Sequence, residues 1–105
     1  MKARLDAQKI SPAPYRAMFG LEVALRTSSK LEPALIELIK MRVSQINGCA
    51  FCLDMHSKDA RAEGESEQRL YALSAWEEAP FFTDRERAAL AWAEDVTLLT
   101  RDHVS

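Results

Sequence analysis

Apolar residues recur at steps of three and four along most of this chain, which is the spacing of amphipathic helices. The clearest stripe runs Leu35, Ile39, Val43 and Ile46. Pro33 precedes it, at a position suited to a first helical turn, and Asn47-Gly48 follows it with two residues that tolerate the left-handed backbone of a helix end. These signals predict a helix over residues 33–47, and the near absence of alternating β-branched stretches predicts no sheet.

Four further helices are expected from similar signals. One begins near Pro14, carries Met18, Leu21 and Leu25, and ends at Ser28-Ser29. Another runs from about Cys49 to Glu63, because Gly64 supplies the next stop.

The last two predicted helices have polar caps at their starts. Ser66 caps a segment whose buried stripe should be Leu70, Leu73 and Trp76, and Pro80 closes it. Thr83 and Glu86 form a capping box before the final helix, which carries Ala89, Trp92, Ala93, Val96 and Leu99. We expect Trp76, Trp92, Phe81 and Phe82 to be packing residues and Arg85, Glu86 and Arg87 to form a solvated face.

With 105 residues, the chain is expected to form a single all-α domain over residues 1–105, with the connection Ser28–Glu32 as its most exposed hinge. Its net charge of −2 gives no electrostatic case for binding nucleic acid or an anionic membrane. The sequence also contains no apolar run of the roughly 20 residues needed to span a bilayer and no signal peptide. We therefore expect a cytoplasmic protein.

The candidate reactive residues are Cys49, Cys52 and His56, which form a Cys-x-x-Cys-x-x-x-His pattern. At about 100° per residue, the three side chains fall within about 60° of arc on one helix face. Backbone donors at the first turn favour a thiolate, and His56 lies one turn beyond Cys52, where an imidazole can accept a thiol proton. Glu37 lies on the preceding helix, and an antiparallel helix pair could bring its carboxylate against His56.

Three other interpretations of the cysteine pair compete with this one. A structural disulfide is possible, although so short a loop would contribute little stability. A zinc site could use Cys49, Cys52, His56 and Glu37, but a second ligand pair is missing from the sequence. A thioredoxin fold would place the motif after a strand, which this chain does not offer.

Taken together, these residues resemble the carboxymuconolactone decarboxylase superfamily, and within it the alkylhydroperoxidase D-like (AhpD-like) branch. The resemblance runs from about Leu31 to Ala93. It rests on Glu37-Leu38, on Val43-Ser44-Gln45-Ile46-Asn47-Gly48-Cys49-x-x-Cys52-x-x-x-His56, and on Arg61-Ala62-x-Gly64, Arg69-Leu70, Ala75-Trp76 and Phe82-Thr83-x-Arg85-Glu86-Arg87-Ala88-Ala89-Leu90-Ala91-Trp92.

The resemblance implies an all-α fold that assembles into trimers or hexamers, with a thiol peroxidase site at the start of the Cys-x-x-Cys helix. Cys52 would attack a hydroperoxide substrate, Cys49 would resolve the product as a disulfide, and His56 and Glu37 would relay protons. The reductant would be a small dithiol or lipoyl-type partner, and no cofactor is expected. The alternatives are a non-catalytic redox sensor or binding protein of the same fold, or a decarboxylase-like enzyme.

Two departures from the family pattern matter. The best-characterised peroxidase members have a second histidine between the cysteines, where this chain has Phe51. Members also usually continue for several helical turns beyond the equivalent of Val104-Ser105, so we expect the C-terminus to be truncated.

Five short helices cannot cover every apolar stripe that they carry. The stripe with Trp92 or that with Leu21 and Leu25 should therefore be buried by a neighbouring subunit.

Overall fold

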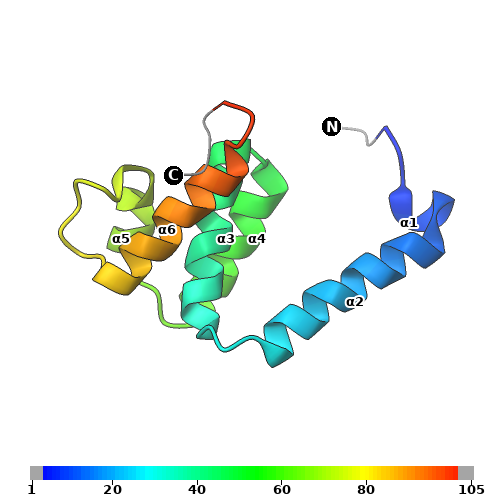
Figure 1. Ribbon diagram of the computed structural model, residues 1–105, viewed down its shortest axis with the longest axis horizontal. Helices are drawn as coiled ribbons and strands as arrows, with labels where there is room; N and C mark the ends of the chain where they lie inside the picture. Colours follow the sequence, from blue (N-terminus) through cyan, green and yellow to red (C-terminus); the bar gives the residue numbers. More distant parts are fainter. Residues whose placement is uncertain (1–3, 102–105) are drawn as a thin grey trace. The chain divides into compact units, whose positions relative to one another are not determined.

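The computed structural model describes residues 4–101, and within them every regular element is helical (Figure 1). The elements are α1 (Ala7–Ile10), α2 (Pro12–Ser28), α3 (Pro33–Asn47), α4 (Ala50–Ala62), α5 (Glu67–Ala72), the 3₁₀ helix η1 (Leu73–Ala75) and α6 (Asp84–Thr97). The all-α prediction is confirmed. None of the helices in this range is long and apolar enough to cross a membrane.

The chain divides into two compact units, Met1–Leu31 and Glu32–Ser105. The boundary falls inside the connection Ser28–Glu32, which is the hinge predicted from the sequence. The interpretation of residues 1–105 as a single domain stays a prediction.

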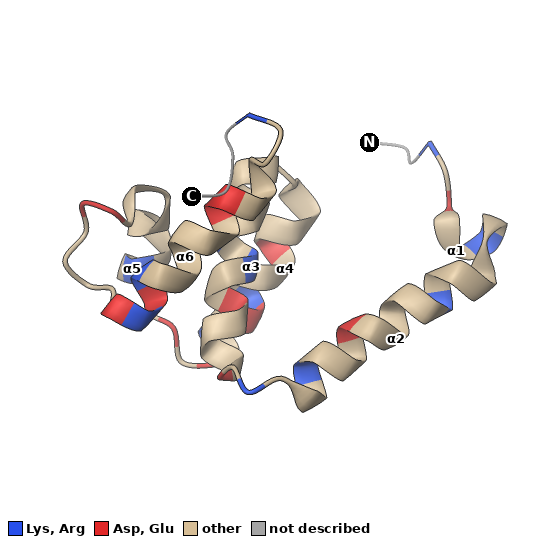
Figure 2. Ribbon diagram, in the orientation of Figure 1, with Lys and Arg blue, Asp and Glu red and all other residues tan. Residues whose placement is uncertain are grey.

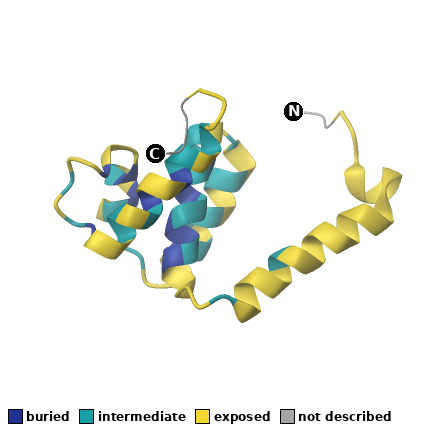
Figure 3. Ribbon diagram, viewed as in Figure 1, coloured by how far each residue is buried: buried dark blue, intermediate teal, exposed yellow. Residues whose placement is uncertain are grey.

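The first unit consists of α1 and α2, and it differs from the sequence-based prediction in two ways. A short helix precedes the expected one, because the Asp6 carboxylate accepts a hydrogen bond from the backbone N–H of Lys9 at 3.3 Å and caps it. The main helix then begins at Pro12 rather than near Pro14. No residue of α2 is buried, so its apolar side chains, Met18, Leu21 and Leu25 among them, stay exposed (Figure 3).

The second unit is built around α3, which packs against α4 and against α6 (Figure 1). Its core contains Leu38, Met41, Ala60, Leu70, Leu73, Trp76, Phe82 and Leu90. The inward face of α3 is therefore centred on Leu38 and Met41, and Ile39, Val43 and Ile46 of the predicted stripe are only half-buried. A helix with partners on two sides needs a wider apolar face than one stripe provides.

The segment after Ser66 is helical for less of its length than predicted. The Ser66 hydroxyl caps α5 as expected, accepting from the Arg69 backbone N–H at 3.2 Å. The α-helix ends at Ala72, however, and continues as the 3₁₀ turn η1. Leu70, Leu73 and Trp76 are nevertheless buried, as the stripe predicted.

An ion-pair cluster joins α5 to the start of α6, where basic and acidic residues meet in Figure 2. The Arg69 guanidinium pairs with Glu86 and with Glu65, whose Oε2 lies 3.0 Å from Nε. Burial by itself would raise the pKa of Glu86, but the hydrogen bonds from Arg69 and from the Thr83 backbone outweigh it, so that pKa is lowered overall. The predicted capping box of Thr83 and Glu86 is present.

The solvated-face interpretation of residues 85–87 is therefore wrong for two of the three. Glu86 is held in the cluster above, and Arg87 donates to the carbonyls of Trp76 at 3.0 Å and Glu77 at 2.9 Å. Only Arg85 is exposed, in a surface pair with Glu32 at 2.8 Å. The hydrogen bonds of Arg87 stabilise the irregular segment between η1 and α6.

Candidate functional site

The site begins at the turn between α3 and α4, where Gly48 has a left-handed backbone with φ of 65°. Its N–H bonds back to Gln45, and the N–H of Cys49 bonds to the Ser44 carbonyl at 3.3 Å. These bonds satisfy the last carbonyls of α3, and glycine adopts this conformation without steric cost. The turn therefore ends α3 and places Cys49 immediately before α4.

Cys49 and Cys52 form a disulfide at the N-terminus of α4, with their Cα atoms 5.2 Å apart. Cys49 is the N-cap residue, and its Sγ accepts a hydrogen bond from the backbone N–H of Cys52 at 3.2 Å. The sulfur takes the place that a serine or aspartate oxygen usually fills at a helix start. Both cysteines are partly accessible to solvent, so the bond lies within reach of a small thiol.

One turn beyond Cys52, His56 contacts Glu37 across the α3–α4 pair. The Nδ1 atom of His56 lies 3.1 Å from Oε2 of Glu37, and the two side chains are 13% and 8% exposed. The contact expected from the helix hairpin is therefore present. When Nδ1–H donates to the carboxylate, Nε2 is left as the nitrogen that can accept a proton.

A second carboxylate, which was not predicted from the sequence, joins this pair. Asp59 offers a carboxylate oxygen to the same group, in which the ligand atoms of Glu37, His56 and Asp59 all lie within 4.8 Å of one another. The available signal was the spacing: Asp59 lies three residues after His56 and so shares its face of α4. The group contains neither cysteine of the predicted zinc set, since both sulfurs are in the disulfide.

The outer side of the Cys-x-x-Cys turn is apolar. Phe51, between the cysteines, is 73% exposed, and Met55 lies one turn further along α4 with its side chain also exposed. The position where the best-characterised peroxidases have a histidine is thus a solvent-facing aromatic ring.

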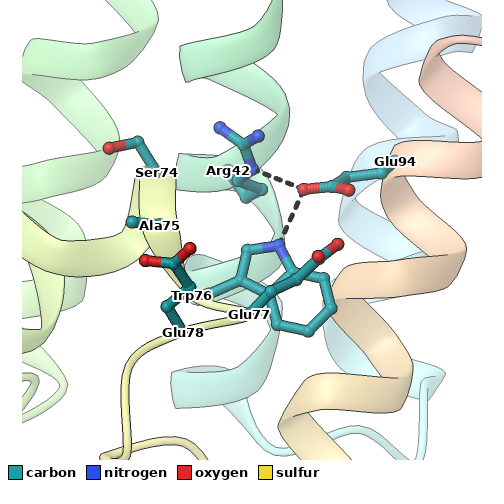
Figure 4. Close-up of a pocket in the computed structure, with 7 residues that line it drawn as sticks. All are labelled: Arg42, Ser74, Ala75, Trp76, Glu77, Glu78 and Glu94. Carbon is teal, nitrogen blue, oxygen red and sulfur yellow. Dashed lines mark hydrogen bonds and ion pairs between the residues drawn. The ribbon is translucent and has the colours of Figure 1, made fainter.

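A separate hollow of about 320 Å³ lies between α3, η1 and α6 (Figure 4). Oε1 of Glu94 accepts from Nε of Arg42 at 2.9 Å and from the Trp76 indole N–H at 2.7 Å. Arg42 also donates to Gln45 at 3.1 Å. Trp76 is a packing residue, as predicted, but no feature of the sequence indicated the Arg42–Glu94 pair, which joins residues 52 apart.

Of the four aromatic residues expected to pack, Trp92 is left uncovered within the chain, on one of the two stripes of which we expect a neighbouring subunit to bury one. Trp92 is 60% exposed, and Val96 and Leu99, further along the chain, are exposed as well. Phe82 is buried, and Phe81 packs against the core.

Comparison with known proteins identifies the family. The model of the carboxymuconolactone decarboxylase family matches residues 12–95. The uncharacterized protein YdfG of Bacillus subtilis is 45% identical over 104 residues, which cover 99% of this chain and 70% of that protein. The uncharacterized protein YnjA of Escherichia coli is 36% identical over 69 residues, covering 66% of this chain and 38% of that protein.

A solved structure agrees with these matches. The crystal structure of a protein of unknown function from Agrobacterium tumefaciens, described as a candidate antioxidant defence protein AhpD, superposes with a TM-score of 0.90 at 44% identity. The superposition covers 99% of this chain and 70% of the Agrobacterium chain. The chain therefore belongs to the carboxymuconolactone decarboxylase family, in its AhpD-like branch.

Proposed function

We propose that this protein is a thiol-dependent peroxidase that reduces hydrogen peroxide or organic hydroperoxides through a disulfide cycle of Cys49 and Cys52. The observation that carries the proposal is the Cys49–Cys52 disulfide at the start of α4 with the largely buried His56–Glu37 pair one turn away. A reactive sulfur pair beside an oriented imidazole is the arrangement that thiol redox chemistry needs. The similar Agrobacterium protein is described as a candidate in antioxidant defence.

In the oxidative half of the cycle, the Cys52 thiolate attacks one peroxide oxygen. The O–O bond breaks, Cys52 becomes a sulfenic acid, and the alcohol or water leaves after taking up a proton. His56 is the proton carrier, because it lies one turn from Cys52, and Glu37 orients its ring through Nδ1. Cys49 then attacks the sulfenic sulfur, the S–O bond breaks, and water leaves as the disulfide forms.

The hydrogen bond at the start of α4 supports the resolving role of Cys49. The backbone N–H of Cys52 points at Cys49 Sγ, and a backbone donor at a helix N-terminus stabilises a thiolate. In the reductive half, one thiolate of a small or lipoyl-type dithiol attacks Cys49 and Cys52 leaves. The second thiol of the reductant then closes its own disulfide and frees Cys49. We place this cycle in the cytoplasm, where dithiol reductants keep thiols reduced.

Rapid mixing of the reduced protein with hydrogen peroxide, and separately with a bulky organic hydroperoxide, tests the proposal directly. Native protein should consume peroxide over many turnovers when a dithiol is supplied. Cys52→Ser should consume none, and Cys49→Ser should form one sulfenic acid at Cys52, detected by mass spectrometry, without turning over. Glu37→Gln should slow the oxidation of Cys52, whereas Asp54→Asn, at an exposed position of the same helix, should not.

Peroxide consumption that is equal in native protein and Cys52→Ser would refute the peroxidase. A disulfide that forms slowly and is not re-reduced by dithiols would instead favour a redox sensor of the same fold. Loss of carbon dioxide from a lactone acid, unchanged in both cysteine variants, would favour decarboxylase chemistry.

A further inference from the structure

We propose that Glu37, His56 and Asp59 form a binding site for a divalent transition-metal ion of the zinc class. The proposal goes beyond the peroxidase cycle, because it uses no sulfur ligand and adds Asp59, which that cycle leaves without a role. It also differs from the zinc site considered from the sequence, which required both cysteines.

The geometry of the three side chains fits such an ion. Zinc binds histidine nitrogen at about 2.0–2.1 Å and carboxylate oxygen at about 2.0–2.2 Å, so tetrahedral ligand atoms lie roughly 3.4 Å apart. The His56–Glu37 separation of 3.1 Å is already close to that edge length. The three ligand atoms all lie within 4.8 Å of one another, so side-chain movements of about 1 Å would complete the set.

The charge and the ligand types favour the same ion. Two carboxylates bring two negative charges to a site where Glu37 is buried and the other two residues are half-buried. A divalent cation neutralises both charges, which is worth more in a partly desolvated site than at the surface. One imidazole with two carboxylates suits zinc and its neighbours in the first transition row, whereas magnesium and calcium prefer oxygen ligands throughout.

The backbone holds the ligands in place before the ion binds. His56 and Asp59 are three residues apart on α4, and Glu37 comes from α3, which packs against α4. Three protein ligands leave a fourth tetrahedral position for water, as in open zinc sites. An ion bound at Nδ1 of His56 would replace the contact through which Glu37 orients the imidazole in the proposed peroxidase, so bound zinc should slow oxidation of Cys52. This last consequence rests on the proposed function, but metal binding itself does not.

Zinc titration of the full chain in its disulfide form tests the site. Calorimetry should give one ion per chain after chelator treatment, and Co²⁺ should give the visible absorption bands of a tetrahedral site. Asp59→Asn should weaken zinc binding at least about 10-fold, since it removes a ligand. Asp54→Asn is the matched control: it removes an exposed carboxylate of the same helix, paired with Lys58, and should bind as tightly as the native chain.

A Cys49→Ser/Cys52→Ser double variant separates this proposal from the peroxidase. It should have no peroxidase activity and should still bind one zinc ion with native affinity. The site is refuted if zinc binds equally to native protein and Asp59→Asn, or if the stoichiometry in the disulfide form stays far below one. Binding that appears only after reduction, and is lost in the double variant, would also refute it by assigning the ion to the thiolates.

Discussion

Replacing Glu94 with alanine should destabilise the second unit more than any other single carboxylate removal around the hollow in Figure 4. One oxygen of Glu94 accepts both the Arg42 Nε and the Trp76 indole N–H. Those bonds connect α3, α6 and the segment after η1, which are far apart in sequence. The same change leaves α3 and α6 in contact but removes their polar connection.

The size of the effect follows from what each donor loses. Hydrogen bonds to a charged group contribute about 1.5–3 kcal/mol, and a buried donor left without an acceptor costs about 1–3 kcal/mol. Trp76 is 5% exposed, so its indole loses a charged acceptor in a largely buried setting, whereas Arg42 keeps its bond to Gln45. We therefore expect Glu94→Ala to lower the free energy of unfolding by about 3 kcal/mol. Glu94→Gln retains an acceptor oxygen and should cost about 1 kcal/mol.

Urea unfolding at neutral pH, followed by far-ultraviolet circular dichroism, measures these differences. Glu78→Ala is the control, because it removes an exposed carboxylate that lines the same hollow and should change stability by less than about 0.5 kcal/mol. The reasoning fails if Glu94→Ala and Glu94→Gln are equally stable, or if Glu94→Ala lies within 1 kcal/mol of the native protein, on the order of ordinary surface changes.

Four further outcomes are expected. The pKa of Glu86 is lowered by folding, so the Glu86 carboxylate stabilises the fold fully above its ordinary pKa of 4.5, and this contribution is lost as the pH falls through the lower pKa of the folded state. Glu86→Gln should therefore make the free energy of unfolding depend less steeply on pH in the acid range, as measured by urea unfolding at several pH values. Gly48→Ala should cost about 1–2 kcal/mol in thermal or urea unfolding, because φ is 65° there. Phe51→His should raise the rate of Cys52 oxidation in rapid-mixing assays without lowering the melting temperature, since the ring is exposed. We also propose a trimer or hexamer, and light scattering should show Trp92→Glu shifting its mass toward the monomer.

Local signals explain why most helix positions were predictable from the sequence. Pro33 and Gly48 bound α3, Ser66 starts α5, and the Thr83 capping box starts α6, each through contacts within a few residues. The 3₁₀ turn η1 was not predictable in this way, and the carbonyls that follow it bind Arg87 of the next helix, a long-range contact. The helix α1 was overlooked, although its Asp6 cap is a local signal.

In the candidate site too, contacts between residues close in sequence were predictable and contacts between distant residues were not. Helix periodicity puts Cys49, Cys52 and His56 on one face, and the short turn at Gly48 makes the contact with Glu37 predictable. Hydrogen-bond partners that are distant in sequence could not be predicted. Arg42 and Glu94 are 52 positions apart, and no local pattern indicates which carboxylate an arginine will pair with. Trp92 is exposed within its own chain, and its packing stays a prediction that rests on the expected subunit contact.

The sulfur of Cys49 both caps helix α4 and forms the disulfide. It caps α4 by accepting the Cys52 N–H, and it is one half of the disulfide. A thiolate is a stronger acceptor than a disulfide sulfur, so reduction should tighten the start of α4 at the moment when Cys52 becomes free to react. Serine at position 49 keeps an acceptor for the cap but forms no disulfide. If Cys49→Ser stays fully helical yet cannot turn over, the helix start and the redox chemistry are separable; if α4 frays, the sulfur is needed for both.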